Sequence, residues 1–411
     1  MRLALLCDDP AMVPWLDAMA SHSTHEVVAA AVVSSLGTEL LRGRTGIRLT
    51  DRWEDLLIAR DIDAILVGGH EPVVLEAIKQ LATAGHAILF LPEAAQGSTF
   101  LYELSLIRDD NRVNLFPVLW HRHDPALVRL RALLRAGSLG AVKLIQLERT
   151  FCRPPGMESL PQAIIDFVLL PDIDLLRWLG GDYNQVTALR TGAANEAVLM
   201  QTVTLAGRDL PEATWHMQAT TGASFSVLTV HAERGRTVAN LEGPTFEWTL
   251  IEPSGTKVIG NRVTAARERL DEIEPLLSQG DPPAAWPELL KVFETLDATQ
   301  RSVKRRRTIE LHFEPMSERA TFKTQMTAMG CGVLVATLLL ALVYLAIASL
   351  VPQAPLPGGP PDGWERVRNV LHIGRVFVFA PPAIFLVLQL LYPLTRPTTG
   401  LANEDAARNS A

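Results

Sequence analysis

Residues Trp120 to Phe151 read WHRHDPALVRLRALLRAGSLGAVKLIQLERTF, and the folding pattern of the chain changes within this stretch. An Arg is followed by Asp-Pro, an amphipathic helix and a Gly-x-Leu-Gly turn, after which a long apolar strand begins. The residues before and after this stretch are therefore expected to form two different domains.

Short apolar strands alternate with helical segments before this stretch, a pattern that builds a parallel sheet covered by helices. Residues 1–120 are therefore predicted to form a Rossmann-like, doubly wound α/β domain of the NAD(P)-binding type. Helices are expected over Trp53–Ala59 and Pro72–Ala84. The expected strands are Leu3–Cys7, Glu26–Val33, Ala64–Gly69, His86–Leu91 and Val113–Trp120.

Longer β-rich segments follow from Lys143, and several of them alternate apolar and polar residues between Gly, Asn or Pro turns. This alternation is typical of an antiparallel sheet with one buried face. Residues 121–315 are predicted to form an α+β domain with a mainly antiparallel open sheet. A closing amphipathic helix is expected over 285–303, followed by a last strand in TIELHF.

The end of the chain is apolar. No charged residue occurs between Lys323 and Asp362, and residues 325–395 are predicted to form a two-helix transmembrane hairpin, followed by a short polar tail at 396–411. Five basic residues precede the first span and three lie between the spans, which favours both termini inside. The sequence thus predicts a multi-pass protein of the cell (inner) membrane, with its main domains in the cytoplasm and the lipid bilayer as a partner.

Charge and cysteine content exclude other classes of partner. The 411 residues carry a formal net charge of −7, so there is no overall basic surface for nucleic acid. The three cysteines have no spacing typical of a metal site or a disulfide framework, and we expect no metal.

Four stretches together resemble the glucose-fructose oxidoreductase, inositol dehydrogenase and MocA (Gfo/Idh/MocA) family. They are LTDRWEDLLIARDIDAILVGG (49–69), AGHAILFLPEAA (84–95), residues 120–151 and LLPDIDLLRWLGG (169–181), and their order and spacing match over roughly residues 1–315. The resemblance implies NAD(P) bound at a GxGxxG turn, a catalytic Lys in a Glu-Lys-Pro segment, and a catalytic Asp and His in a DxGxH segment.

These family positions hold different residues in this chain. The glycine turn falls on CDDPAM (7–12), which contains no glycine. The Lys position is Pro92, the Asp position is Phe167 and the His position is Pro171. None of these three side chains exchanges a proton with a hydroxyl group.

The remaining polar residues give a few site predictions. Asp8 and Asp9 would set carboxylates against a pyrophosphate, although Asp9 also suits a helix N-cap. Asp166 is the predicted residual acid or base, whereas Asp174 is predicted to cap a helix. His70 follows a strand at the carboxyl edge of the parallel sheet and is predicted to line the cleft, as Asp8 and Asp9 would.

Two functions follow from this pattern. The leading prediction is a membrane-anchored pseudoenzyme, a non-catalytic binding or regulatory module that holds no cofactor. The alternative is a divergent NAD(P)-dependent oxidoreductase that acts on a sugar-like substrate. A homo-oligomer through the open sheet and a membrane-protein partner are further expectations.

Overall fold

The computed structural model describes residues 1–313, with gaps at 7–11, 22–23, 34, 45, 153–159, 192–197, 243–246, 253 and 280–284, and also residues 337, 339–346 and 349. The chain divides into two compact units, Met1–His312 and Phe313–Ala411. The predicted domain boundaries near 120 and 315 stay predictions.

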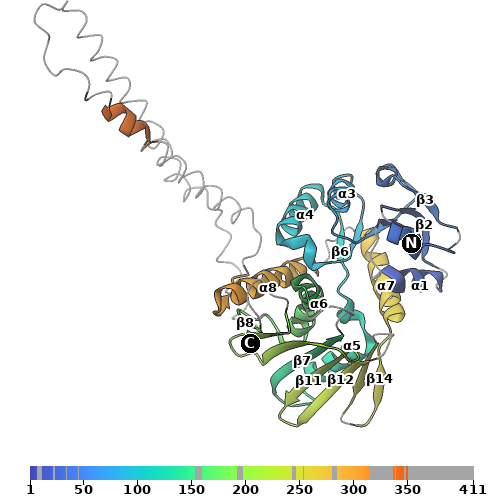
Figure 1. Ribbon diagram of the computed structural model, residues 1–411. Helices are drawn as coiled ribbons and strands as arrows, with labels where there is room; N and C mark the ends of the chain where they lie inside the picture. Colours follow the sequence, from blue (N-terminus) through green and yellow to red (C-terminus); the bar gives the residue numbers. More distant parts are fainter. Residues whose placement is uncertain are drawn as a thin grey trace, which may run out of the picture. The chain divides into compact units, whose positions relative to one another are not determined.

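A six-stranded parallel sheet forms the first layer, with the strand order β3-β2-β1-β4-β5-β6 of a doubly wound fold (Figure 1). Its strands are β1 (Arg2–Leu6), β2 (Glu26–Ala31), β3 (Arg48–Thr50), β4 (Ala64–Val67), β5 (Ile88–Phe90) and β6 (Leu115–Pro117). Strand β4 is at most 1% exposed along its whole length, because helices cover both faces of the sheet. This part of the predicted fold is confirmed.

Among the described residues, helices and short 3-10 turns lie between these strands, and the turn η4 follows β6. They are α1 (Val13–Ala20), α2 (Ser35–Leu40), η2 (Trp53–Leu56), α3 (Pro72–Thr83), η3 (Ala94–Gln96), α4 (Gly97–Asn111) and η4 (Trp120–His123). The helix expected over Trp53–Ala59 is only the 3-10 turn η2, and the short strand β3 was not predicted. Leu49 of β3 is 56% exposed, so this edge strand lacks the apolar pattern of a buried one.

A nine-stranded sheet forms the second part, in the order β14-β13-β12-β11-β7-β10-β9-β8-β15. Its pairs are antiparallel except for β7 with β10, which run parallel. The strands are β7 (Val142–Cys152), β8 (Gln185–Thr191), β9 (Met200–Ala206), β10 (Glu212–Thr220), β11 (Phe225–Ala232), β12 (Gly235–Glu242), β13 (Glu247–Ile251), β14 (Lys257–Ile259) and β15 (Ile309–Glu310). The mainly antiparallel sheet is therefore confirmed.

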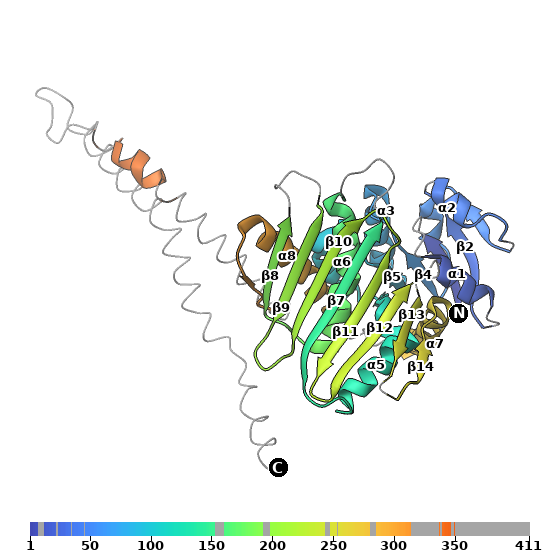
Figure 2. The same cartoon turned by 60° about the horizontal axis from the view of Figure 1, so that its bottom comes forward.

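Helices cover one face of this sheet. They are α5 (Pro125–Arg135), α6 (Gln162–Gly180) and α8 (Ala285–Arg305), and Figure 2 shows the opposite face with no described helix in front of it. Along β9, Val203 and Leu205 are fully buried while Thr202 and Thr204 between and beside them are only half-buried, as expected for a sheet with one covered face.

Helix α7 (Arg262–Gln279) was not predicted, and it returns to the first sheet. It packs beside α1 (Figure 1), and its residues Ala266, Leu270 and Ile273 join Trp15 in one buried cluster. The segment is rich in charged residues and its apolar stripe is narrow, so its sequence pattern does not predict a helix clearly. The chain therefore builds the parallel domain partly from residues that follow the open sheet.

The predicted membrane spans are not supported. Among the residues that the structure describes, no helix has the length and apolar character needed to cross a bilayer. This finding contradicts the predicted location in the cell membrane, and we correct that prediction. Most of the hairpin predicted over 325–395, and all of the tail at 396–411, lies outside the described residues.

Candidate functional site

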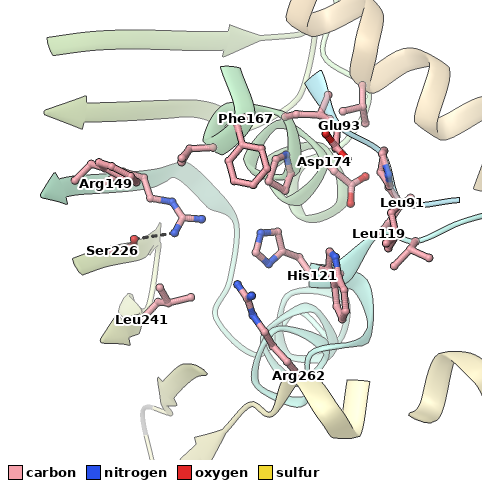
Figure 3. Close-up of a pocket in the computed structure, with 18 of the residues that line it drawn as sticks. Leu91, Glu93, Leu119, His121, Arg149, Phe167, Asp174, Ser226, Leu241 and Arg262 are labelled. Carbon is pink, nitrogen blue, oxygen red and sulfur yellow. Dashed lines mark hydrogen bonds between the residues drawn. The ribbon is translucent and has the colours of Figure 1, made fainter. Parts of the chain in front are cut away.

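A cavity of about 430 Å³ lies where the carboxyl ends of β5 and β6 meet the covered face of the open sheet (Figure 3). The residues after the two parallel strands supply one side of it. Helix α6, strands β7 and β11 and the start of α7 supply the other sides. Ligands of doubly wound folds bind at this edge of the sheet.

The three positions that the resemblance equates with catalytic residues all line this cavity. They are Pro92 after β5, and Phe167 and Pro171 on α6. The assignment of the family's catalytic positions to these three residues therefore agrees with their places around one cavity. The side chains at these positions give the cavity an apolar wall.

His121 lines the same cavity and is only 8% exposed. It belongs to the 3-10 turn η4, which follows β6 at the carboxyl edge of the parallel sheet. Its Nε2 lies 3.7 Å from Asp172 Oδ1, and its ring packs edge-on against Trp248 with 6.0 Å between ring centroids. The imidazole is thus held between a carboxylate and an indole, with its ring in the middle of the cavity (Figure 3).

Asp172 is fully buried and has a complete set of donors. It accepts hydrogen bonds from Arg149 Nε at 2.8 Å and Trp215 Nε1 at 2.7 Å, and also from Arg149 Nη2. Burial alone would raise the pKa of Asp172, but the charges and hydrogen bonds of Arg149 and His121 hold the pKa below its usual value. The carboxylate therefore stays ionised beside the imidazole.

Asp174 does not cap a helix, contrary to the prediction. Helix α6 begins at Gln162, twelve residues earlier, and continues through Pro171. The buried Asp174 carboxylate instead accepts hydrogen bonds from Arg122 Nη2 at 2.6 Å and Arg122 Nε at 3.1 Å. This ion pair joins η4 to α6 at the side of the cavity.

His70 lies at the carboxyl edge, as its place after β4 predicts, but it is not among the residues that line the cavity. Its side chain is 53% exposed, and its Nδ1 lies 2.8 Å from Glu93 Oε2. Glu93 lines the cavity and also accepts a hydrogen bond from the N–H of Gly69 at 2.6 Å. His70 therefore contacts the lining residue Glu93 without lining the cavity itself.

Asp166, the predicted acid or base, does not line the cavity either. Its two carboxylate oxygens accept hydrogen bonds from Gln162 Nε2 and from Gln300 Nε2 on α8, both at 2.9 Å. Burial raises the pKa of Asp166, although these two amides oppose the shift. Its predicted role therefore gains no support from its position, and Asp8 and Asp9 lie outside the described residues.

His123 lies on the same turn as His121 but faces α7, where its Nδ1 is 3.6 Å from Glu272 Oε2. Burial and the positive charge of Arg269 lower the pKa of His123 to about 4, so the ring is neutral at physiological pH. Of the two histidines that flank Arg122, only His121 serves the cavity. The position of His121 after β6, at the carboxyl edge of the parallel sheet, was visible in the sequence. Its neighbour Asp172 could not be identified there.

The residues at the strand ends suit the nicotinamide of NAD(P), the cofactor that the resemblance implies. A nicotinamide is a flat ring with one carboxamide, so it needs an apolar wall with a polar group beside it. Leu91, Val118 and Trp120 give the lining apolar surface at these strand ends, and Glu93 lines the cavity with them. The turn after β1, where the resemblance places the pyrophosphate, lies outside the described residues.

Comparisons with known proteins support the resemblance. No protein-family model matches the chain. The myo-inositol dehydrogenase Hyg17 of Streptomyces leeuwenhoekii is 31% identical over 127 residues, which are 30% of this chain and 39% of that relative. The match thus spans well under half of the relative's length.

Solved structures match over far more of the chain. A myo-inositol dehydrogenase from Corynebacterium glutamicum has a TM-score of 0.61 and 17% identity, covering 76% of this chain and 99% of its own. The chain has the fold of the inositol dehydrogenases. GenD2 of gentamicin A biosynthesis, solved in complex with NAD, has a TM-score of 0.61 and 16% identity, covering 76% and 96%.

These comparisons contradict the leading prediction of a non-catalytic binding or regulatory module. The relative and the structures with this fold are dehydrogenases and oxidoreductases, and they favour the alternative prediction. The expectation that no cofactor binds is likewise not supported, because structures with this fold hold NAD. The prediction rested on the loss of the three glycines, the Lys and the His of the family pattern, and it did not foresee that His121 lines the cavity with the buried Asp172 beside it.

Proposed function

We propose that the protein is an NAD(P)-dependent oxidoreductase of the Gfo/Idh/MocA type, which interconverts a hydroxyl and a carbonyl group on a small sugar-like substrate. One observation carries the proposal. The imidazole of His121, backed by the ionised Asp172, stands in a cavity at the carboxyl edge of a doubly wound sheet.

His121 is the proposed acid and base. Oxidation of an alcohol needs a group that accepts the hydroxyl proton, and histidine exchanges protons in the physiological pH range. The Asp172 carboxylate lies 3.7 Å from Nε2, so Nδ1 is the ring nitrogen that remains for the substrate. The nicotinamide, when bound, supplies the hydride acceptor or donor.

Arg149 is a positioning residue in this scheme. Its guanidinium donates to Asp172 from Nε and Nη2, and its Nη1 donates to Ser226 Oγ at 2.8 Å. These contacts keep the Asp172 carboxylate ionised and oriented. Pro92, Phe167 and Pro171 exclude water from the opposite side, which strengthens the electrostatic interactions inside.

Turnover is the test. The full chain is incubated with NAD or NADP and a panel of polyols, sugars and hydroxy acids, and the absorbance of the reduced nicotinamide is followed. We expect reduction of at least one cofactor with at least one member of the panel. Absence of turnover with every pair, in protein that binds the cofactor, would overturn the proposed activity.

We also propose that two copies associate through the uncovered face of the open sheet (Figure 2). Strand β10 lies inside this sheet, between β7 and β9, and Thr214 of β10 is half-buried on that face. Light scattering of the full chain should give twice the mass of one chain, and Thr214→Arg should reduce it to one. A single-chain mass for the unaltered protein would contradict this association.

A further inference from the structure

Exposed aromatic side chains line part of the cavity. Phe167 of α6 and Phe225, the first residue of β11, are 56% and 41% exposed, although both belong to the lining. Phe151 of the neighbouring strand β7 also lines the cavity and is half-buried. Figure 3 shows the Phe167 side chain extending from α6 toward the space that holds His121. A ligand that covers such exposed rings gains free energy from the apolar surface it removes from water.

The lining next to these rings is apolar as well. Helix α6 contributes Val168 and Pro171, and helix α8 contributes Leu289 and Val292. Hydroxyl groups of a ligand that face these side chains would find no hydrogen-bond donor or acceptor on them, so their burial is unfavourable. A ring with a hydroxyl group on every carbon therefore suits this part of the cavity poorly. A ligand that presents carbon and hydrogen there suits it better.

This apolar surface is distinct from the one that suits the nicotinamide. Leu91, Val118 and Trp120 follow the parallel strands β5 and β6, whereas Phe167 and Phe225 belong to α6 and the open sheet. With the nicotinamide at the strand ends, the exposed rings remain for the part of the substrate that does not react.

The cations of the cavity have carboxylates beside them. Arg149 forms an ion pair with the fully buried Asp172. Burial and the positive charge of Arg149 lower the pKa of Arg262, and the nearby carboxylate of Asp124 acts in the opposite direction. Positive charge on this side of the cavity is therefore already offset by two carboxylates of the chain.

The two carboxylates that line the cavity are engaged too. Asp174 accepts hydrogen bonds from Arg122. Glu93 accepts one from the N–H of Gly69 and lies 2.8 Å from His70 Nδ1. Charges of both signs thus surround the cavity and are paired with groups of the chain itself, so neither an anionic nor a cationic ligand gains a counter-charge reserved for it. The described lining favours a ligand without formal charge.

We propose that the substrate of this site is an uncharged glycoside whose aglycone is an aromatic ring. The sugar hydroxyl group that reacts lies at His121, and the aromatic ring packs against Phe167 and extends toward Phe225. Offset-stacked and edge-to-face contacts between aromatic rings add to the gain from burial. This inference rests on the proposed function for the reaction, but binding of the glycoside can be measured without turnover.

Matched glycosides test the proposal. Phenyl and methyl β-D-glucopyranoside are titrated calorimetrically into the full chain with and without NADH, as are the two corresponding galactopyranosides. In each pair that binds, we expect the phenyl glycoside to bind about 10- to 100-fold more tightly, the range given by burial of one aromatic ring. Phenyl β-D-glucuronide, in which a carboxylate replaces CH₂OH, should bind no more tightly than phenyl β-D-glucopyranoside.

Substitution of the exposed rings locates the aromatic group. Phe167→Ala and Phe225→Ala should each reduce the preference for the phenyl glycoside, by about 3- to 10-fold for Phe167→Ala. Phe167→Leu, which keeps apolar surface without a ring, should keep part of the preference. Leu106→Ala is the matched control, because Leu106 of α4 is 49% exposed but does not line the cavity, and it should keep the whole preference. Melting temperatures check that each variant folds.

Failure of this inference differs from failure of the proposed function. The aryl-glycoside assignment would be overturned if the methyl glycosides bind as tightly as the phenyl glycosides, if no phenyl glycoside binds, or if the glucuronide binds more tightly than the glucoside. An unchanged preference in both Phe167→Ala and Phe225→Ala would overturn it as well, even if another sugar is turned over. Binding of phenyl glycosides against Phe167 without oxidation by NAD or NADP would instead overturn only the oxidoreductase.

Discussion

The two sides of the cavity carry opposite chemistry. The α6 side and the end of β5 bring Phe167, Pro171 and Pro92 to positions where the related dehydrogenases are expected to hold catalytic residues. The side formed by η4 and the open sheet brings His121 and Arg149, joined through the buried Asp172. In the proposed mechanism, the fold keeps the place of the site while the acid and base come from another wall of the cavity.

The largest expected effect is on turnover, where substitutions on the two sides of the cavity should differ strongly in kcat/KM. His121→Gln should lower kcat/KM by about 10²- to 10⁴-fold, the usual range for one general acid or base, with cofactor affinity unchanged. Pro92→Ala on the opposite side should change kcat/KM by less than about threefold, because that side chain moves no proton. The measurement is steady-state turnover on the best substrate of the panel. Equal losses for both variants would contradict the assignment of the acid and base to His121.

Asp172→Asn should cause the largest loss of stability. The change leaves the Arg149 guanidinium, which is only 13% exposed, without its counter-charge, and breaking such a buried pair costs about 3–5 kcal/mol. Urea unfolding measures the free energy of unfolding, with Asp209→Asn as control because Asp209 is 91% exposed. A loss as small as that of the control would show that Asp172 is not ionised.

The difference in unfolding free energy between the unaltered protein and Asp172→Asn should depend on pH, which tests again whether Asp172 is ionised. The pKa of Asp172 is lower in the folded chain than its usual value near 4, so its stabilising contribution is complete above that value. The contribution is lost as the pH falls through the lower pKa of the folded state. The gap in unfolding free energy between the unaltered protein and Asp172→Asn should therefore be constant at neutral pH and shrink only in acid. If the difference in unfolding free energy shrinks already between pH 7 and pH 6, the titrating group is not Asp172.

Gly260→Ala should have a smaller effect, through the turn that supports His121. A Cβ at Gly260 would overlap the carboxylate of Asp124, which caps α5 by accepting hydrogen bonds from the N–H groups of Ala126 and Leu127. Loss of such a cap costs about 1 kcal/mol. Gly222→Ala is the control, because a Cβ there meets nothing closer than 3.7 Å. Thermal unfolding of both variants decides whether the cap is displaced.

Much of the fold was predictable, because strands such as β4 and β7 carry their periodicity in the sequence. The short edge strand β3 and the charged helix α7 were not, since their stability depends on neighbours that are distant in the sequence. The positions of Pro92, Phe167 and Pro171 in one cavity followed from the order and spacing of the matching stretches.

The chemistry of the site was less predictable. Asp166 lies on the same helix as Phe167 and Asp172, but the helical rotation of one residue directs it to Gln300 instead of the cavity. His121 and Asp172 are 51 positions apart and meet only after η4 packs against α6. A single sequence does not show this pairing, because it depends on the angle between two elements.

The most direct test of the oxidoreductase assignment is calorimetric titration of NAD, NADH, NADP and NADPH into the full chain. Binding of at least one of them in the micromolar range is the predicted result, with the affinity unchanged in His121→Gln. Absence of binding by all four at millimolar concentration, in folded protein, would contradict the assignment and leave the cavity without the reaction proposed for it.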